Sequence, residues 1–270
     1  MKLPLTYLFV PGNRPERFDK ALAAGAGAVI LDLEDAVSPK DKAQARANII
    51  DWALAHSAAL DCVFVRINDA TTPLFKGDLE CIRRSGIANV MLPKAESASQ
   101  VGQVMVSLPK HGAVMPIIES ARGVVHVNTI AAAAGVQRLA FGTLDYAVDL
   151  ALTDDERGLI HPSAQIAIAS RAAGIASPVA GVTPALDDES RLLADLAFAR
   201  AFGFGAKLCI HPKQVAAIHR AMQPSAVEVD WARRVLAAAA ASEGAVQVDG
   251  KMVDRPVLLH AQSILDRCAE

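Results

Sequence analysis

The chain contains few aromatic residues and no excess of positive charge. Phe, Trp and Tyr make up 4% of its 270 residues, and the formal net charge is −2, without a prominent basic run. Nucleic-acid binding needs a concentrated positive footprint. We therefore exclude nucleic acid as a partner, although a basic pocket for one anionic ligand remains compatible with this composition.

Long apolar runs and closely spaced cysteines are also missing. No apolar run approaches the roughly 18 residues that suggest a membrane span. Pro4 interrupts the first apolar stretch, and a charged segment follows without a cleavage site, unlike a signal peptide. The four cysteines show no C-x-x-C spacing, and Cys62 and Cys209 fall within predicted strands. We therefore expect a cytoplasmic protein with reduced, buried thiols and no membrane attachment.

The chain does contain a repeated unit of a short apolar strand followed by an amphipathic helix, which recurs eight times at roughly 30-residue spacing. The strands are nearly all apolar and rich in β-branched residues, as in a parallel sheet that is buried on both faces. A doubly wound sheet is the alternative, but eight regular units favour a closed (β/α)8 TIM barrel. The predicted strands are 6–10, 28–33, 62–67, 89–93, 113–118, 137–141, 178–182 and 206–210.

Local signals set the bounds of several helices. Pro15 suits the first turn of a helix, and Ser38, just before Pro39, is a predicted helix N-cap. The barrel is predicted to span 1–222. Pro224 then breaks the chain, a helix follows at about 230–242, and Asp249-Gly250 is typical of a hairpin turn. We expect this 223–270 extension to pack on its own barrel or on a neighbouring subunit.

Charged residues interrupt the apolar strands mainly at their C-terminal ends. Those ends meet on one rim of a parallel barrel, where barrel enzymes carry out their chemistry. The sequence therefore predicts one site from residues that are far apart in the chain: Glu34, Asp35, Arg66, Lys94, Glu119 and Asp145.

Glu119 and Asp145 follow the adjacent fifth and sixth predicted strands. Two carboxylates, completed by substrate oxygens and waters, are a usual way of holding Mg²⁺. The alternative is a pair of surface carboxylates that cap helices.

Arg66 ends the third predicted strand. A guanidinium there can grip a carboxylate or stabilise a developing oxyanion. The alternative is a structural ion pair with Glu34 or Asp35, and both interpretations can hold together, because the acids could orient the arginine.

Other basic residues near this rim are weaker candidates for ligand binding or catalysis. Arg14, Arg17 and Lys20 surround the first loop and could bind a phosphate-bearing ligand at the following helix N-terminus, or they form a solvated face. Lys94 could form a Schiff base only with a depressed pKa, and the nearby Glu96 favours an ion pair instead. His211, before Pro212, is expected to order the rim or the binding cleft. The histidine spacing does not favour zinc.

Seven ordered motifs, LFVPGNRPERFDKA, VILDLEDAV, VRIN, VMLPKAES, PIIESARG, FGTLDYAVDL and CIHPKQV, together resemble the citrate lyase β-subunit family. This larger group of HpcH/HpaI aldolases includes malyl-CoA and citramalyl-CoA lyases. The resemblance covers the whole chain, including the tail segment KMVDRPVLLHA. It implies a TIM barrel and Mg²⁺-dependent cleavage of a carbon–carbon bond in 3-hydroxyacyl thioesters.

The resemblance also implies roles for individual residues. Glu119 and Asp145 would hold the metal, Arg66 would bind substrate and act in catalysis, and Asp35 with Glu34 would support the metal water and the arginine. Asp254 resembles an acid that CoA lyases of the family supply from a neighbouring subunit. Many relatives carry an acid where this chain has Leu144, which removes one charge from the rim. The remaining substrate- and CoA-binding positions would be Arg14, Lys20, Pro93, Lys94 and His211.

The implied reaction is retro-Claisen cleavage of an acyl-CoA of the malyl-CoA or citramalyl-CoA type to acetyl-CoA and a 2-oxo acid. Three alternatives remain: a citrate lyase β subunit acting on an acyl carrier protein (ACP), a class II aldolase acting on free 4-hydroxy-2-oxo acids, and a non-catalytic subunit that binds an acyl carrier. The first loop and the tail favour a thioester substrate. Trimers are common in the family, so a homotrimer is expected.

Overall fold

The computed structural model describes residues 3–153, 156–241 and 246–268, and the chain forms two compact units. The first unit is residues 1–218 and the second is residues 219–270. Among the described residues, no helix is both long enough and apolar enough to cross a bilayer.

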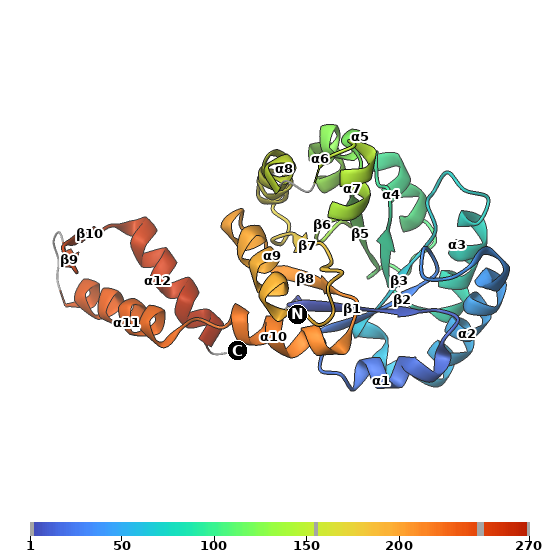
Figure 1. The fold of residues 1–270 in the computed structure, drawn as a ribbon, viewed down its shortest axis with the longest axis horizontal. Helices are drawn as coiled ribbons and strands as arrows, with labels where there is room; N and C mark the ends of the chain where they lie inside the picture. The colour runs from blue at the N-terminus through green and yellow to red at the C-terminus, as the bar shows by residue number, and fades with distance from the viewer. Residues whose placement is uncertain (1–2, 154–155, 242–245, 269–270) are drawn as a thin grey trace. The chain divides into compact units, whose positions relative to one another are not determined.

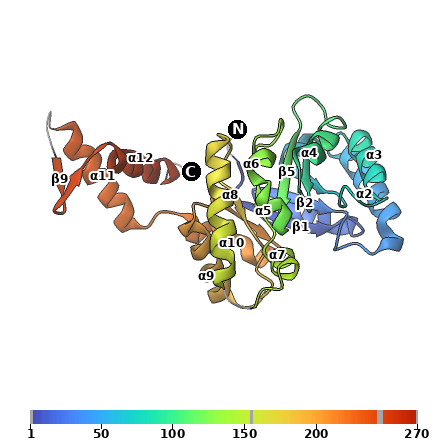
Figure 2. The same ribbon diagram turned by 90° about the horizontal axis from the view of Figure 1, so that it is seen from above.

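The first unit is a closed barrel of eight parallel strands, hydrogen-bonded in sequence order, with β1 also pairing with β8 (Figures 1 and 2). This confirms the TIM barrel over the doubly wound alternative. The strands are β1 Thr6–Pro11, β2 Ala28–Asp32, β3 Val63–Arg66, β4 Asn89–Leu92, β5 Ala113–Ile118, β6 Ala140–Phe141, β7 Val179–Ala180 and β8 Ala206–Cys209.

Strands β6 and β7 are two residues long, much shorter than predicted. Near β7 the cause is local: Pro178 has no N–H to donate to a ladder. The carbonyl of Gly181 accepts a hydrogen bond from the Lys207 side chain at 2.8 Å. This part of the barrel wall is therefore held partly by side chains.

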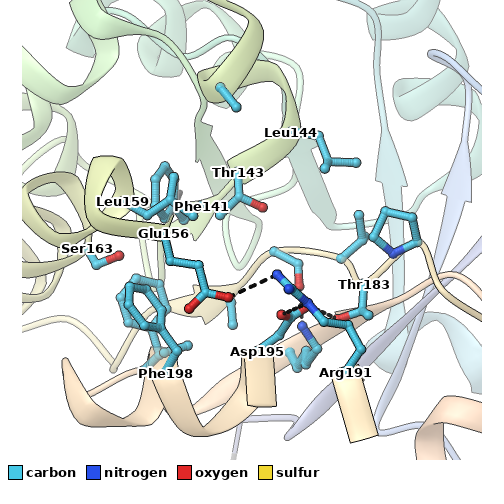
Figure 3. A pocket seen from close by; sticks show the side chains of 18 of the residues that line it. Phe141, Thr143, Leu144, Glu156, Leu159, Ser163, Thr183, Arg191, Asp195 and Phe198 are labelled. Carbon is cyan, nitrogen blue, oxygen red and sulfur yellow. Dashed lines mark hydrogen bonds and ion pairs between the residues drawn. The ribbon is translucent and has the colours of Figure 1, made fainter. Parts of the chain in front are cut away.

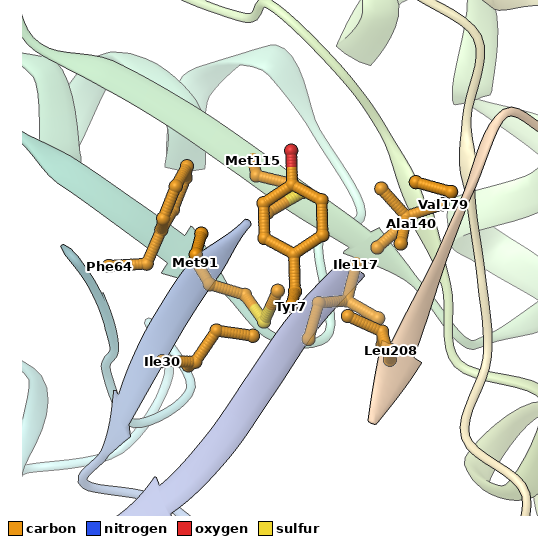
Figure 4. Packing of buried hydrophobic residues seen from close by; sticks show 11 residues of the cluster. Tyr7, Ile30, Phe64, Met91, Met115, Ile117, Ala140, Val179 and Leu208 are labelled. Atoms are coloured by element: carbon orange, nitrogen blue, oxygen red, sulfur yellow. The ribbon is translucent and has the colours of Figure 1, made fainter. Parts of the chain in front are cut away.

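Every second residue of the strands points into the barrel and forms a packed core (Figure 4). Tyr7 lies in this core, edge-on to Phe64 with 5.4 Å between ring centroids. The buried Arg138 donates to the Tyr7 hydroxyl at 3.3 Å and to the Pro4 carbonyl at 2.7 Å, near the start of β1. The core members are Tyr7, Ala28, Ile30, Phe64, Met91, Met115, Ile117, Ala140, Val179, Ala206 and Leu208.

Helices cover the outside of the barrel (Figure 2). The α-helices are α1 Phe18–Leu22, α2 Lys42–Ala55, α3 Phe75–Ser85, α4 Ala98–Met105, α5 Ala121–Val125, α6 Val127–Ala131, α7 Thr143–Asp149, α8 Ile160–Ala172, α9 Glu189–Ala201 and α10 Pro212–Met222. Short 3-10 helices are η1 Pro15–Arg17, η2 Pro39–Asp41, η3 Ser57–Cys62 and η4 Glu156–Leu159.

Two local predictions need comment. Ser38 is the N-cap residue of η2, as predicted, but it makes no side-chain cap bond, because its hydroxyl donates to the Asp41 carboxylate at 2.7 Å instead. Cys62 ends η3 rather than lying in β3, and its thiol contacts the Ala59 carbonyl. Cys209 is buried within β8 as expected, and all four cysteines are free.

The second unit pairs two helices with a small hairpin. It contains α11 Ala226–Ala240, β9 Val246–Val248, β10 Lys251–Val253 and α12 Arg255–Cys268. Helix α11 begins earlier than predicted, because Ser225 and Glu228 form a capping box. Asp249 and Gly250 both have positive φ, which confirms the predicted hairpin turn. Ala232, Val235, Ala261 and Ile264 form the buried centre of this unit.

Candidate active site

The C-terminal ends of the barrel strands surround a cavity of about 280 Å³. Its lining includes Asp32 at the end of β2, Asp35 after it, Arg66 of β3, Glu119 after β5 and Asp145 in α7. The structure therefore brings together side chains that are separated by more than a hundred positions in the chain. It does so because parallel strands present all their C-terminal ends to one rim.

Asp32 holds Arg66 by a two-pronged contact. The Nε and Nη2 atoms of Arg66 each donate to a different Asp32 oxygen at 2.7 Å. Asp32 is fully buried, and it also accepts the backbone N–H groups of Glu34 and Ala36. The guanidinium lies 4.7 Å from the centroid of the Phe9 ring, a cation–π distance. Arg66 is therefore locked in one orientation.

Asp32 was missing from the sequence prediction, which placed Glu34 or Asp35 beside Arg66. The alternation of β2 could have identified it, because Ile30 points into the barrel and Asp32 lies two residues further on. Asp32 is thus an inward carboxylate at the mouth. Asp35 is exposed at the cavity, and no described contact joins it to Arg66.

Glu34 completes the set of acids around the arginine. Its Oε2 atom lies 2.8 Å from Arg66 Nη1, and its Oε1 atom lies 3.8 Å from Lys94 Nζ. Burial raises the pKa of Glu34 to about 7, with Arg66 opposing the shift and Asp35 and Asp32 adding to it. A carboxyl group in this environment can hold a proton near neutral pH.

Lys94 pairs with Glu34 rather than with the predicted Glu96. Glu96 instead accepts from the Ser120 hydroxyl and pairs with Arg122 at 3.7 Å. Burial acts to lower the pKa of Lys94, but the surrounding carboxylates, Glu34 first among them, raise it overall. The amine therefore stays protonated, which does not suit Schiff-base chemistry.

A buried lysine supports the backbone that presents Glu34. Lys42 Nζ donates to the carbonyls of Leu33 and Glu34 at 2.6 and 2.7 Å and to Asn68 Oδ1 at 2.8 Å. Asn68 is in turn held by the buried Asp78. Lys42 carries no functional signal in the sequence, because a lysine at the start of a helix is usually solvated.

Glu119 lies at the base of the cavity and is 5% exposed. Its Oε1 atom accepts the backbone N–H of Lys94 at 2.7 Å. Lys94 adopts a left-handed φ of 47°, directly after the buried Pro93. Burial raises the pKa of Glu119 to about 8, and the negative charges of Glu34 and Asp145 add to the shift.

Gly142 is required for the placement of Glu119. A Cβ atom at position 142 would lie 2.2 Å from Glu119 Oε2 and 2.6 Å from its Cβ. No side chain fits at that distance, so glycine is needed for the close approach of this carboxylate. Gly142 directly precedes α7, whose first turn carries Asp145.

The carboxylates of Glu119 and Asp145 fit a divalent cation. Among the described residues, Asp145 has no hydrogen-bond or ion-pair partner, and Glu119 uses one oxygen only. Their mutual repulsion contributes to the raised Glu119 pKa, and a bound cation would relieve it. Within the described part of the chain, no three His, Cys, Asp or Glu side chains converge as a metal cage. Mg²⁺ is commonly held by one or two carboxylates plus water and substrate oxygens.

Most of the other predicted positions lie outside this cavity's lining, and Leu144 is an exception. Arg14 is exposed near Glu16, and Lys20 is exposed on α1, beyond the short helix η1. His211 is half-buried in the loop after β8, where its Nδ1 accepts the Lys213 N–H at 3.2 Å. Leu144 lines the cavity and is 48% exposed. Asp254 belongs to the second unit, where it is exposed and caps the start of α12 through Val257 N–H at 3.2 Å.

Known proteins match this chain over nearly its whole length. The HpcH/HpaI aldolase/citrate lyase family matches residues 5–212. A citrate lyase subunit beta-like protein of Mycobacterium tuberculosis is 38% identical, and the match covers 98% of this chain and 95% of the relative. An L-malyl-CoA/beta-methylmalyl-CoA lyase of Cereibacter sphaeroides is 33% identical over 96% of this chain and 92% of the relative.

A similar solved structure is CitE of M. tuberculosis in complex with magnesium, acetoacetate and coenzyme A. Its TM-score to this chain is 0.87, with 36% sequence identity, and the match covers 98% of both chains. CitE has also been solved with magnesium and pyruvate, with 32% identity, a TM-score of 0.77, and coverage of 96% of this chain and 97% of CitE.

Proposed function

Because the chain belongs to the HpcH/HpaI aldolase/citrate lyase family and is a carbon–carbon lyase, we propose that it cleaves a 3-hydroxyacyl-CoA thioester of the malyl-CoA or citramalyl-CoA type. The products are acetyl-CoA and a 2-oxo acid. The proposal rests on one observation above all: the cavity that holds Glu119 and Asp145 also holds a fixed arginine, Arg66.

Glu119 and Asp145 would hold Mg²⁺. Both have carboxylate oxygens without a described partner, and the repulsion between the two carboxylates favours a cation between them. When bound, the cation would supply Lewis acidity that lowers the pKa of the substrate's 3-hydroxyl and orients its carboxylate. Support comes from CitE, whose structure contains magnesium together with acetoacetate and coenzyme A.

Arg66 would bind the thioester oxygen. A guanidinium has five N–H donors. Asp32 accepts one from Nε and one from Nη2, and Glu34 forms an ion pair at Nη1, which leaves the second N–H of Nη2 without a described partner. As the C2–C3 bond breaks, negative charge develops on the thioester oxygen, and fixed donors stabilise it without reorganisation. Asp32 acts as a positioning residue in this scheme, because it touches the arginine.

Two proton movements accompany the cleavage. The 3-hydroxyl loses its proton as its oxygen becomes the carbonyl of the 2-oxo acid, and the C2 carbon of the released enolate gains one. We propose that Glu34, whose pKa burial raises to about 7, and the exposed Asp35 hold or relay this proton. We propose that Asp254 of an adjacent subunit, in a homotrimer, exchanges the proton with the substrate itself.

Basic residues at the rim, outside the cavity, would bind CoA. We assign Arg14 and Lys20 to its phosphates and His211, Pro93 and Lys94 to the substrate side. A citrate lyase β subunit of Leuconostoc mesenteroides is 32% identical over 98% of this chain and 93% of the relative. This match supports a second candidate, a citryl thioester carried on an acyl carrier protein.

The deciding experiment measures Mg²⁺-dependent cleavage by the release of a 2-oxo acid, with acetyl-CoA measured alongside for the CoA thioesters. Malyl-, citramalyl- and citryl-CoA are compared with citryl-ACP and a free 4-hydroxy-2-oxo acid, each with and without EDTA. Cleavage of malyl- or citramalyl-CoA to a 2-oxo acid and acetyl-CoA, lost with EDTA, supports the proposal, whereas cleavage of a citryl thioester alone would identify the second candidate. Cleavage of the free acid alone would instead identify a class II aldolase. Binding without any cleavage would identify a non-catalytic subunit.

A further inference from the structure

A second and larger cavity, of about 580 Å³, lies in the first unit on the outer side of the barrel wall (Figure 3). The barrel core contains Ala206 and Leu208, so the residue between them, Lys207, faces the surrounding helices instead. Most of the lining is apolar and includes Phe141 of β6, Leu159 of η4 and Phe198 of α9. This volume is within the range of small-molecule sites.

Lys207 is a buried cation beside this cavity. It is 1% exposed and lines the cavity, and its Nζ donates to the Gly181 carbonyl at 2.8 Å. In the portion of the chain that the structure describes, no carboxylate lies within ion-pair distance of this Nζ and no other acceptor contacts it. Burial lowers the pKa of Lys207 to about 8, with Asp195 opposing the shift, so the ammonium form still predominates at pH 7. Lysines are almost never fully buried without a counter-charge.

The other charged side chains of the cavity, Arg191, Asp195 and Glu156, pair among themselves. Arg191 lies 2.7 Å from Asp195 and 3.0 Å from Glu156, and Asp195 also accepts from the Thr183 hydroxyl (Figure 3). Lys207 therefore keeps two N–H donors without a described acceptor, and Asp195 acts on its charge from beyond ion-pair distance. A single cation with two open donors matches the single negative charge and the two oxygens of a carboxylate.

We propose that this cavity binds a small amphipathic monocarboxylate, whose head group pairs with Lys207 and whose hydrocarbon chain packs against Phe141 and Phe198. The site is separate from the proposed catalytic cavity, and it does not depend on the proposed reaction. Thr143, Leu144 and Val182 line both cavities, so a bound ligand would lie against the wall of the catalytic one.

The test is calorimetric titration of the full-length protein with butanoate, hexanoate and octanoate, and with uncharged hexanamide. Each added CH₂ group should tighten binding about fourfold until the cavity is filled. Hexanoate should bind at least tenfold more tightly than hexanamide, because only the acid pairs with the ammonium. Acetyl-CoA and pyruvate at saturation should not displace hexanoate.

Two variants separate the head-group contact from the chain contact. Lys207→Met replaces the ammonium with an unbranched apolar side chain one atom shorter and should erase the preference for hexanoate over hexanamide. Lys213→Met is the matched control, because it removes an equal charge from an exposed position outside the cavity. Ala199→Leu narrows the cavity and should weaken the binding of octanoate more than that of butanoate. This variant tests the proposal even if Lys207→Met does not fold.

Three results would overturn the proposal. The first is that hexanoate does not bind in the millimolar range. The second is that hexanoate and hexanamide bind equally tightly. The third is that acetyl-CoA or pyruvate displaces hexanoate. The last would assign this cavity to the catalytic site rather than to a separate ligand.

Discussion

Replacement of Arg66 by lysine tests the geometry of the guanidinium while its charge is kept. Arg66 makes two charge-assisted hydrogen bonds to Asp32 at 2.7 Å and an ion pair with Glu34 at 2.8 Å. The three donors of an ammonium radiate from one nitrogen, so they cannot match both Asp32 oxygens and also reach Glu34. The variant should lose at least one such bond, at a cost of about 1.5–3 kcal/mol in the free energy of unfolding.

The larger effect is expected on the reaction. With the fork lost, the open N–H group no longer points at the thioester oxygen. Loss of one such oxyanion donor lowers turnover by roughly 10²–10³, which corresponds to about 2.7–4 kcal/mol. If Arg66 acts on the developing charge, the decrease should appear in kcat and in kcat/KM alike rather than in KM alone.

Arg46→Lys is the matched control. Arg46 is similarly buried, with 19% of its side chain exposed against 14% for Arg66, and it pairs with the buried Asp78 at 2.7 Å. It should lose comparable stability in urea unfolding and keep its turnover. The reasoning is refuted if Arg66→Lys cleaves the thioester at close to the wild-type rate, or if Arg46→Lys loses as much turnover as Arg66→Lys.

Four further predictions follow from individual residues. Glu119→Gln and Asp145→Asn should each abolish Mg²⁺-dependent turnover and leave the far-UV circular dichroism unchanged, and full activity in either variant would remove that residue from the metal site. Gly142→Ala should lower turnover at least tenfold, because its Cβ would lie 2.2 Å from Glu119 Oε2, whereas Gly102→Ala, whose Cβ meets nothing within 4 Å, should keep it. Burial lowers the pKa of Lys207 to about 8 in the folded protein, below the ordinary value of 10.5. Between these two pH values the folded protein binds fewer protons than the unfolded chain, so the free energy of unfolding should rise with pH across that window. Urea unfolding at pH 7.5, 9 and 10 should show the wild type gaining up to about 3 kcal/mol relative to Lys207→Met, and parallel curves would contradict the lowered pKa. Mixed oligomers of Asp254→Ala and Glu119→Gln should regain part of the activity if the site is shared between subunits, and no recovery after proven subunit exchange would place Asp254 outside the neighbour's site.

The fold was predictable from the sequence because the barrel rests on a repeated local pattern. Apolar, β-branched runs at regular spacing can be buried only in a parallel sheet, and each crossover in such a sheet needs a helix. The rim position of Arg66, Glu119 and Asp145 followed from the same logic, since each follows an apolar run. Strand lengths were less predictable: β7 is two residues long, partly because Pro178 lacks an N–H and a side chain uses the Gly181 carbonyl.

Contacts between side chains were decided by the tertiary structure. From the sequence, several acids could have paired with Arg66. The register of β2 and β3 places Asp32 opposite Arg66, and this makes Asp32 its principal partner. Lys94 pairs with Glu34, which is sixty positions away, and not with Glu96, which is two positions away. Local sequence spacing does not determine such pairs, because barrel closure brings distant strand ends within hydrogen-bond distance.

The sequence by itself determined the repeated strand–helix pattern, the rim on which the charged residues gather and the hairpin turn at Asp249-Gly250. The tertiary structure alone decided that Gly142 makes room for Glu119, that Lys42 holds the backbone before Glu34, and that Lys207 is buried without a carboxylate partner in the described chain. The physical reason is that hydrophobic periodicity is a property of neighbouring residues. Burial, close approach and charge compensation depend instead on which distant atoms the closed barrel places around each side chain.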